Sequence, residues 1–297
     1  MTTTTMVPSA AEAEIRAGAR FEFGENWRSF LSVLDDDRIR DAECSLRDML
    51  EVPDLRGLRF LDAGSGSGLF SLAARRLGAE VHSFDFDPQA VACTAELRHR
   101  YFPDDEQWRI EQGSVLDIDY LTTLGTFDVV YSWGVLHHTG SMWQALENVT
   151  SLVAEGGALF IAIYNDQGFW SRSWRSIKRR YCESSPLVRR LLLIGAGSYF
   201  EARELAYRVA ARQPKSRGKS DRGMSTAHNL KDWVGGYPFE VAKPERILEA
   251  CRPKGFVLRR LVTCGGGIGC NQFVFGRLSS REAETSVLFA PPTARVR

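Results

Sequence analysis

The amino-acid sequence predicts an α/β fold in which helices cover both faces of a mostly parallel sheet. Short apolar segments alternate with helical segments from Leu58 onward, and this alternation implies that the strands pair in parallel. The stretch from Arg59 to Phe70, RFLDAGSGSGLF, also turns from a strand into a helix through Gly64, Gly66 and Gly68. Because ligands of such sheets bind beyond the carboxyl ends of the strands, we expect the functional site there.

The composition is that of an ordinary globular protein, with 297 residues, 44% hydrophobic, 25% charged and a formal net charge of +1. The first residues lack the apolar run of a signal peptide, and the longest apolar segments are too short to span a bilayer. The six cysteines form no CxxC pair, so we expect reduced thiols, a cytoplasmic protein and no bound metal. A net charge near zero without a recognisable nucleic-acid module argues against a nucleic-acid partner.

We expect six regions along the chain. They are a disordered or loosely ordered start (1–20), an N-terminal helical lid (21–57), the cofactor-binding core (58–164), a mainly helical cap over the substrate (165–250), the closing strands (251–278) and a C-terminal tail (279–297). Phe21, Phe23, Trp27 and Phe30 give the lid too much aromatic surface for a loose tail, although they could simply pack on the flank of the domain. A structureless loop as long as 165–250 is implausible in a compact domain, so we expect helices there.

Caps and turn residues place the individual elements. Asp35 to Asp37 are N-cap candidates for a helix, and Asp87 with Pro88 begins another. The expected strands of the core are 59–63, 81–84, 108–112, 127–132 and 158–164. Two later strands, 256–263 and 271–275, are joined by the glycine-rich CGGGIGC. Because that connection is short, these two strands must be antiparallel.

The spacing of the glycines indicates which cofactor the turn binds. A dinucleotide fingerprint reads GxGxxG, whereas the turn here reads GxGxG and follows Asp62. A carboxylate at that point repels a pyrophosphate and suits a cationic ligand. Asp85 follows the first glycine by about 20 residues, the offset at which an acid accepts hydrogen bonds from ribose hydroxyls. The alternative is that the glycines serve only a tight turn.

DAGSGSG followed by FDFDP resembles the class I S-adenosylmethionine (SAM)-dependent methyltransferases, from Leu58 to Tyr164 and more loosely in the closing strands. The resemblance implies a Rossmann-like seven-stranded, mostly parallel sheet whose last strand inserts antiparallel beside the fifth. It also implies that SAM is the cofactor. The expected reaction is methyl transfer to a small-molecule acceptor by in-line displacement without metal, as in the bacterial methyltransferases of quinone-biosynthesis type.

The resemblance also assigns residues to the cofactor. Asp62 would face the ammonium group, Asp85 would accept from both ribose hydroxyls, and Phe86 would lie against the adenine. The expected cofactor-binding residues are Asp62, Gly64, Ser65, Gly66, Gly68, Asp85, Phe86, Ser114, Val115 and Ser132. Ser114 departs from the family, which often has Asp at that position.

Two histidines are the first candidates for catalysis. The segment SWGVLHHT follows the fourth strand and therefore lies beside the sulfonium. A neutral imidazole can take a proton from an attacking hydroxyl or amine, and we expect His138 to be that base, with His137 second. The alternative is that the pair only packs or orients the loop.

Two further catalytic candidates, Asp166 and His228, lie after the fifth strand. Asp166 could orient or deprotonate a substrate, or it could cap the following helix. His228 belongs to a segment dense in aromatic residues, acids and glycines, which favours a pocket lining over an anchoring loop. The expected substrate-binding residues are Tyr164, Trp233, Tyr237, Glu240 and Asn271.

A basic run from Arg172 to Arg190 contains little acid. It is either a solvated helix face or a feature that attracts an anionic acceptor. Two other functions stay open. One is an NAD(P)-dependent oxidoreductase, which the glycine spacing and Asp62 disfavour, and the other is a catalytically idle SAM-binding or scaffold protein.

Overall fold

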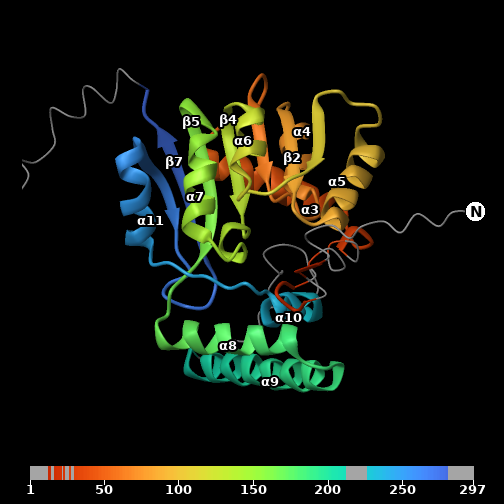
Figure 1. The fold of residues 1–297 in the computed structure, drawn as a ribbon, viewed down its shortest axis with the longest axis vertical. Helices are drawn as coiled ribbons and strands as arrows, with labels where there is room; N and C mark the ends of the chain where they lie inside the picture. Colours follow the sequence, from red (N-terminus) through yellow and green to blue (C-terminus); the bar gives the residue numbers. More distant parts are fainter. Residues whose placement is uncertain are drawn as a thin grey trace, which may run out of the picture.

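The structure, a computed structural model, describes residues 13–14, 17–21, 23, 27, 30–211 and 226–279. These residues form a seven-stranded sheet with the order β3-β2-β1-β4-β5-β7-β6. Helices lie on both faces of the sheet, and a further helical layer lies beyond its carboxyl edge (Figure 1). The expected α/β class is therefore confirmed.

Five strands run parallel and the last two close the sheet. The strands are β1 (Arg59–Ala63), β2 (Glu80–Asp85), β3 (Trp108–Gln112), β4 (Phe127–Trp133), β5 (Val153–Tyr164), β6 (Phe256–Val262) and β7 (Cys270–Arg277). β1 pairs in parallel with β2 and β4, whereas β7 lies antiparallel between β5 and β6. This is the closing hairpin that the short glycine-rich connection predicts.

The described helices are α3 (Asp36–Leu50), α4 (Leu69–Arg76), α5 (Pro88–Tyr101), α6 (Ile118–Leu124), α7 (Met142–Ser151), α8 (Phe169–Glu183), α9 (Pro186–Ala211), α10 (Thr226–Gly235) and α11 (Pro244–Cys251), with short 3₁₀ turns η1 (Leu136–His138) and η2 (Arg252–Lys254). Three of the described helices begin at an aspartate whose side chain caps them, namely α3, α5 and α6. Asp35 and Asp87 cap α3 and α5 as expected, by accepting from the backbone N–H groups of Arg38 and Gln89. The sequence reading missed the short helix α6. None of the helices in the described part is long and apolar enough to cross a membrane.

Alternate side chains of the central strands enter two apolar layers, because successive residues of a strand face opposite sides of the sheet. Phe60 and Val129 pack on the side of α3, α4 and α5. Leu61 and Val130 pack on the side of α6, α7 and α11. These two apolar layers pack the helices on both faces of the sheet. The packing fixes the positions of the strand ends, which carry the polar residues of the site.

A third apolar cluster joins the cap helices α8, α9 and α10 to the residues before α11. Its fully or largely buried members are Phe21, Trp174, Tyr181, Cys182, Ala196, Val234 and Phe239. Lys178 is fully buried among them, donates a hydrogen bond to the carbonyl oxygen of Trp233, and lies over the rings of Trp233 and Phe239 at 4.2 and 4.8 Å. The cap is therefore packed on its own core instead of resting loosely on the sheet.

Candidate active site

A cavity of about 480 Å³ lies at the carboxyl ends of β1, β2 and β4. Its walls are the glycine turn after β1, the end of β2, the loop after β3, the η1 turn, α3 and the described residues before α3. A volume of this size is typical of sites for small molecules and cofactors. The site therefore lies at the edge of the sheet that the alternating pattern predicts.

The three glycines of the turn adopt backbone conformations that other residues rarely take. Gly64, Gly66 and Gly68 have φ angles of 91°, 55° and 80°. A Cβ on Gly64 would stand 2.5 Å from both γ carbons of Val135, and one on Gly68 would stand 2.8 Å from the Cα of Thr94. Glycine is required here both for the conformation and for the close approach of neighbouring elements.

The amides of this turn donate hydrogen bonds within the protein. The N–H groups of Gly64 and Ser65 both donate to the carbonyl oxygen of Phe84, at 2.9 and 3.1 Å. The N–H of Gly66 donates to Oδ2 of Asp85 at 2.9 Å. Gly64, Ser65 and Gly66 are expected cofactor-binding residues, and in the structure their amides tie the turn to the end of β2.

Asp62 is held by a buried chain of hydrogen bonds that the sequence reading missed. The indole N–H of Trp108 donates to the Ser83 hydroxyl, which donates to the Ser71 hydroxyl, which donates in turn to Oδ2 of Asp62 at 2.5 Å. All four side chains are buried. Burial raises the pKa of Asp62 to about 7, and the hydrogen bond from Ser71 acts in the opposite direction. The carboxyl is thus oriented before any ligand binds.

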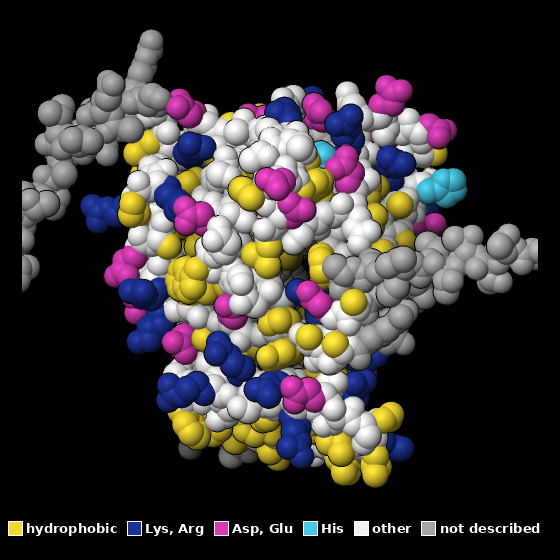
Figure 2. Space-filling model, in the orientation of Figure 1, with side chains coloured by type: hydrophobic (Ala, Val, Ile, Leu, Met, Phe, Trp, Pro, Cys, Tyr) yellow, Lys and Arg dark blue, Asp and Glu magenta, His cyan; other side chains and the backbone are white. Residues whose placement is uncertain are grey.

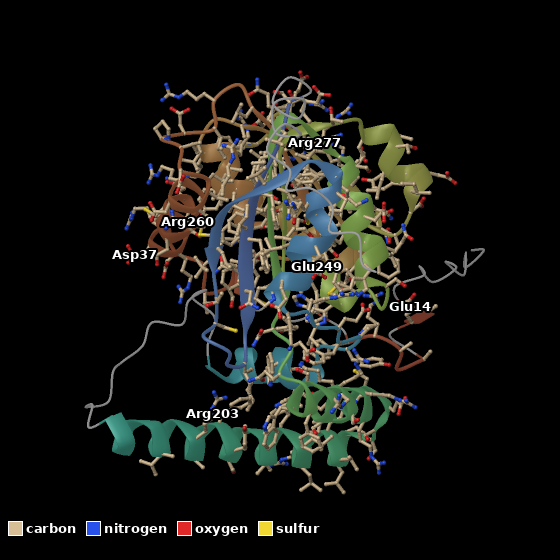
Figure 3. All side chains as sticks on the ribbon, turned by 90° about the vertical axis from the view of Figure 1, so that its left-hand side faces the viewer. Glu14, Asp37, Arg203, Glu249, Arg260 and Arg277 are labelled. Carbon is tan, nitrogen blue, oxygen red and sulfur yellow. The ribbon has the colours of Figure 1, made fainter. Side chains whose placement is uncertain are left out.

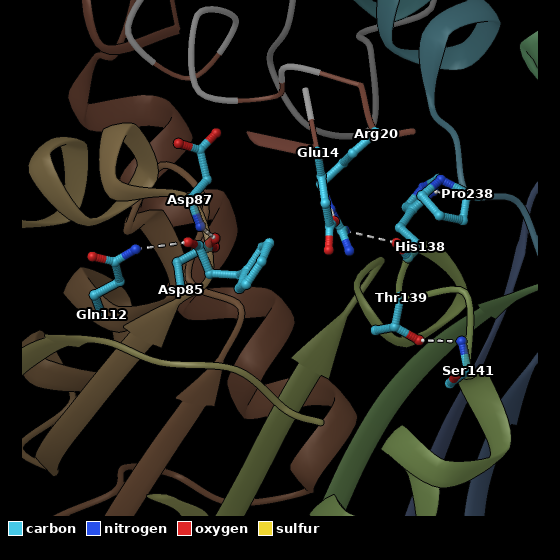
Figure 4. Close-up of polar contacts among 10 residues, drawn as sticks. Glu14, Arg20, Asp85, Asp87, Gln112, His138, Thr139, Ser141 and Pro238 are labelled. Atoms are coloured by element: carbon cyan, nitrogen blue, oxygen red, sulfur yellow. Dashed lines mark hydrogen bonds and ion pairs between the residues drawn. The ribbon is translucent and has the colours of Figure 1, made fainter. Parts of the chain in front are cut away.

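Asp85 lies at the end of β2 and also faces the cavity. Its Oδ2 accepts from Gly66, and its Oδ1 accepts from the N–H of Asp87 at 2.9 Å (Figure 4). Burial raises the pKa of Asp85 to about 6, while the two backbone hydrogen bonds lower it. Each carboxylate oxygen has a second lone pair, so both can still accept from a ligand.

The residues expected around the adenine are only partly brought to the cavity. Phe86, Ser114 and Val115 line it. The Ser114 hydroxyl accepts from the N–H of Leu116 at 3.1 Å and so stabilises the loop after β3. Ser132 is fully buried, lies away from the cavity lining, and donates to the carbonyl oxygen of Ala63 at 2.8 Å, which joins β4 to β1.

His138 lines the cavity at the end of the η1 turn. Its Nδ1 lies 2.7 Å from the carbonyl oxygen of Pro238, and its ring lies 5.0 Å from the ring of Phe23. Burial lowers the pKa of His138 to about 3, and the nearby cations Lys178 and Arg20 act in the same direction. The ring is therefore neutral over the whole working range of pH.

His137 is completely buried and does not line the cavity. Its Nδ1 accepts a hydrogen bond from the N–H of Tyr164 at 3.3 Å, and its carbonyl oxygen accepts from the N–H of Glu240 at 2.9 Å. His137 thus connects the η1 turn to the end of β5 and to the segment before α11. Of the two histidines, only His138 reaches the space where a substrate can bind.

The other acceptor-side candidates lie outside the cavity lining and hold loops together. Asp166 accepts from the N–H of Gly168 at 2.8 Å and so holds the turn before α8, but it does not cap that helix, whose N-cap is Gly168. The carboxylate of Glu240 accepts from the N–H of Met142 at 2.9 Å and so caps α7. Asn271 donates to Oδ1 of Asn165 at 3.1 Å and accepts from the N–H of Cys264.

The aromatic candidates belong to the core of the cap. Tyr164 packs between His137 and Trp233, with ring centroids at 4.0 and 5.1 Å. Tyr237 packs in the same cluster, and its carbonyl oxygen accepts from the N–H of Phe21. His228 lies on α10, but its side chain is outside the part of the chain that the structure describes.

Arg20 is a cavity residue that the sequence reading missed, because nothing in its local pattern sets it apart. Its guanidinium donates to Oε2 of Glu14 at 2.7 Å and to the carbonyl oxygen of His138 at 2.9 Å (Figure 4). It also lies over the ring of Phe86 at 4.9 Å. Arg20 therefore bridges the loop after β2 and the turn after β4 across the cavity.

Aromatic residues before α3 complete the cavity wall. Phe23, Trp27 and Phe30 line it, together with Arg38 and Asp41 of α3. Trp27 lies so close to the glycine turn that a Cβ on Gly66 would stand 3.0 Å from its indole ring. The position of Trp27 beside the glycine turn favours a lid over packing on the flank of the domain.

The fold and the site together define an α/β protein with a nucleoside-type cofactor site at the carboxyl edge of its sheet. Residues 61–159 match the family described as "Methyltransferase domain". This match supports a class I SAM-dependent methyltransferase core in this part of the chain. The match begins at β1 and ends within β5, so it contains the glycine turn, Asp62, Asp85 and both histidines.

Known relatives share this core but not the whole chain. A ubiquinone biosynthesis O-methyltransferase of Parvibaculum lavamentivorans is 34% identical over 126 residues, which cover 40% of this chain and 45% of the relative. A ribosomal protein L11 methyltransferase of Methylococcus capsulatus is 41% identical over 71 residues, 24% of either chain. Among solved structures, magnesium protoporphyrin IX methyltransferase from Synechocystis PCC 6803 has a TM-score of 0.49 at 13% identity, over 92% of this chain and 89% of that chain. The chain spans at most about half the length of the curated relatives it matches.

Proposed function

We propose that this chain transfers a methyl group from SAM to a hydroxyl group of a small-molecule acceptor. The observation that carries the proposal is that Asp62 and Asp85, at the ends of the neighbouring strands β1 and β2, line one cavity with the glycine turn between them. Two carboxylates so placed suit an ammonium group and a pair of ribose hydroxyls, and they repel a pyrophosphate. The methyltransferase domain over 61–159 supports the same reading.

The residues at the cavity fit SAM as the cofactor. Asp62 would hold the ammonium group and Asp85 the ribose, while Phe86 and Val115 would contact the adenine. The crowding around Gly64 and Gly68 leaves no space for a side chain at the turn. When bound, SAM supplies an electrophilic methyl group on a sulfonium. The protein's own contribution is then to align the acceptor and exclude water.

His138 is the group we propose to receive the proton of the acceptor. Because the carbonyl of Pro238 can only accept, Nδ1 of His138 carries the ring proton and Nε2 keeps its lone pair. A pKa of about 3 makes Nε2 a weak base. A weak base is sufficient, since a hydroxyl that is gaining a methyl group becomes strongly acidic.

The cavity walls support an aromatic acceptor, because Phe23, Trp27 and Trp133 supply aromatic surface. The lining contains Arg20 and Arg38 but also six aspartates, and the two arginines are ion-paired with Glu14 and Asp35. The basic run of α8 does not line the cavity, so the charge of the walls does not favour an anionic acceptor. The ubiquinone biosynthesis relatives act as O-methyltransferases by name, which favours oxygen as the methylated atom.

We also propose that the protein works in the cytoplasm without a nucleic-acid partner. The six cysteines form no disulfide bond with one another in the structure, which suits a reducing compartment. The exposed arginines of the basic run from Arg172 to Arg190 lie on helices that also expose Trp170, Leu187 and Leu191. A surface that mixes basic and large apolar side chains in this way differs from a nucleic-acid-binding groove.

Ligand binding and methyl transfer can be tested in one series. Calorimetry and thermal unfolding with SAM, S-adenosylhomocysteine and NADH should give binding and stabilisation by the first two alone. Asp85→Asn should weaken SAM binding, and Asp128→Asn, at the opposite edge of the sheet, should not. Transfer of labelled methyl is then measured with hydroxyl-bearing aromatic compounds against matched amines. Stabilisation by NADH alone would support the oxidoreductase, and SAM binding without transfer to any acceptor would support the idle protein.

A further inference from the structure

The helix α9 forms the outermost layer of the molecule beyond the cap (Figure 1). One of its faces packs inward, through Leu192, Leu193, Ala196 and Phe200, onto the cluster that contains residues of α8 and α10. A helix with a single neighbouring layer normally presents a polar face to the other side. The outer face of α9 instead presents large apolar side chains to solvent.

Four large aliphatic side chains form a row on the outer face of α9. Leu187, Leu191, Ile194 and Leu205 are 69%, 59%, 58% and 56% exposed. With about 3.6 residues per turn, these positions share one face of the helix. Ser198 and the exposed Glu201 fall between Ile194 and Leu205 on that face, so the face also carries one carboxylate. We call these four residues the α9 row.

Exposed apolar side chains are concentrated on this side of the molecule. Seven of the fourteen exposed large hydrophobic side chains in the described part belong to α8 and α9. They include Phe169 and Trp170 at the start of α8, whose rings are 5.7 Å apart. Figure 2 shows yellow apolar atoms along the edge formed by α9, and Figure 3 shows mostly carbon-only side chains that point from α9 away from the sheet. Clustering of this kind marks an interaction surface.

The same two helices carry a local surplus of positive charge. From Phe169 to Ala211 the sequence has nine Lys or Arg against three Glu, a surplus of six positive charges in a chain whose formal net charge is +1. Exposed arginines of this layer include Arg172, Arg180 and Arg190. In Figure 2 the dark blue side chains form a band just above the apolar edge. Apolar and basic groups are therefore arranged as adjacent strips.

We propose that the α9 row is a docking surface for a lipid bilayer that contains anionic lipids. In this arrangement the row enters the boundary between headgroups and acyl chains, and the arginines meet the lipid phosphates. The exposed Phe169 and Trp170 suit the same boundary, where aromatic residues gather. The proposal concerns attachment to the bilayer surface and does not depend on methyl transfer.

Charge complementarity favours a bilayer over the other partners. A second copy docked on the same face would bring together two layers that each carry the surplus of six positive charges, and like charges across an interface are unfavourable. A nucleic acid would neutralise the arginines but would leave the α9 row in water. Since α8 and α9 lie beyond the carboxyl edge of the sheet, bilayer attachment would also turn the edge that carries the cavity toward the membrane (Figure 1).

Vesicle flotation of the full-length protein tests the proposal. We expect the protein to float with phosphatidylcholine vesicles that contain phosphatidylserine, less with phosphatidylcholine alone, and less at high salt because salt screens the arginines. Leu191→Glu combined with Ile194→Glu should lower vesicle affinity by about tenfold or more, since two apolar side chains leave the lipid. Val257→Glu changes an equally exposed side chain on the edge strand β6 and should leave binding intact.

Three results would overturn the proposal. The first is flotation that is absent, or equal with and without phosphatidylserine. The second is unchanged binding of the Leu191→Glu and Ile194→Glu variant, with thermal unfolding used to verify that the variant is folded. The third is light scattering that shows a wild-type dimer which this variant converts to a monomer, because the row would then serve self-association.

Discussion

The Nδ1 atom of His138 lies 2.7 Å from the carbonyl oxygen of Pro238. A carbonyl can only accept, so this contact fixes the ring proton on Nδ1 and leaves Nε2 as the basic nitrogen. Pro238 belongs to the segment that follows α10, so the cap orients a ring that the core supplies.

Replacing His138 by Ala should reduce turnover about a hundredfold, because a positioned proton acceptor contributes in that range. SAM affinity, measured by calorimetry, should stay within about twofold, since the cofactor contacts come from other strands. His99→Ala, on the exposed side of α5, is the matched control and should have no effect on either quantity. Unchanged turnover in His138→Ala would show that His138 is not the proton acceptor.

The stability contributed by His138 should depend on pH in a defined direction. Burial holds its pKa at about 3 in the folded protein, against about 6.5 in an unfolded chain. Between these values the unfolded state binds more protons, so stability is lost as pH falls from about 6.5 toward 3. Thermal unfolding of wild type and His138→Gln across that range should show wild type losing more stability. Parallel curves would contradict the low pKa.

SAM affinity should rise with pH through the titration of Asp62. The pKa of this carboxyl is raised to about 7 by burial, and only the ionised form attracts an ammonium group. Calorimetry should therefore show affinity increasing several-fold between about pH 6 and pH 7.5. Ser71→Ala removes the hydrogen bond that lowers the pKa, so its midpoint should move to higher pH. Ser176→Ala, on α8, should reproduce the wild-type curve, and an unshifted Ser71→Ala curve would refute the role of the buried hydrogen-bond chain.

Arg20→Ala should weaken SAM binding by about tenfold, mainly through faster dissociation, because it releases the link between Phe86 and the carbonyl oxygen of His138. Arg59 offers a matched control. It makes the same two kinds of contact at the other edge of the sheet, with the ring of Phe127 and the carbonyl oxygen of Thr126. Stopped-flow measurement should show faster cofactor release from Arg20→Ala than from Arg59→Ala. Equal release rates in the two variants would argue against a lid held by Arg20.

Gly68→Ala should destabilise the protein more than Gly255→Ala. Both glycines lie in the left-handed region, with φ and ψ of 80° and 5° at Gly68 and 80° and 20° at Gly255, so both substitutions carry a comparable backbone strain. An added Cβ at Gly255 meets nothing within 4 Å, whereas at Gly68 it would stand 2.8 Å from the Cα of Thr94. The difference in free energy of unfolding, about 1 to 3 kcal/mol, measures the close approach of α5 to the turn. Equal losses of unfolding free energy in the two variants would show that backbone strain alone accounts for the requirement for glycine at position 68.

The core of the fold could be predicted because the sequence signals for its elements are local. Strand-to-helix turns, caps and the closing hairpin each depend on a few neighbouring residues, and these were confirmed. The short helix α6 was missed, since its seven residues are too few to show a helical period.

The acceptor side could not be predicted in the same way. Asp166, Glu240 and Asn271 are the polar side chains that a pattern suggests for a pocket, yet each forms hydrogen bonds that hold a loop. Arg20 and Trp27, which do line the cavity, stand in a segment without a recognisable motif. Polar residues near a strand end are needed for loop structure as often as for ligands, and sequence spacing does not distinguish the two uses.

By itself the sequence determined that Asp62, the glycine turn and Asp85 lie together, since they follow one another along a single strand, turn, helix and strand. The tertiary structure decided what faces them. Arg20 meets the backbone of His138 across 118 residues, and His138 meets Pro238 across 100. Such contacts depend on how the lid, the core and the cap pack together, which no local spacing encodes.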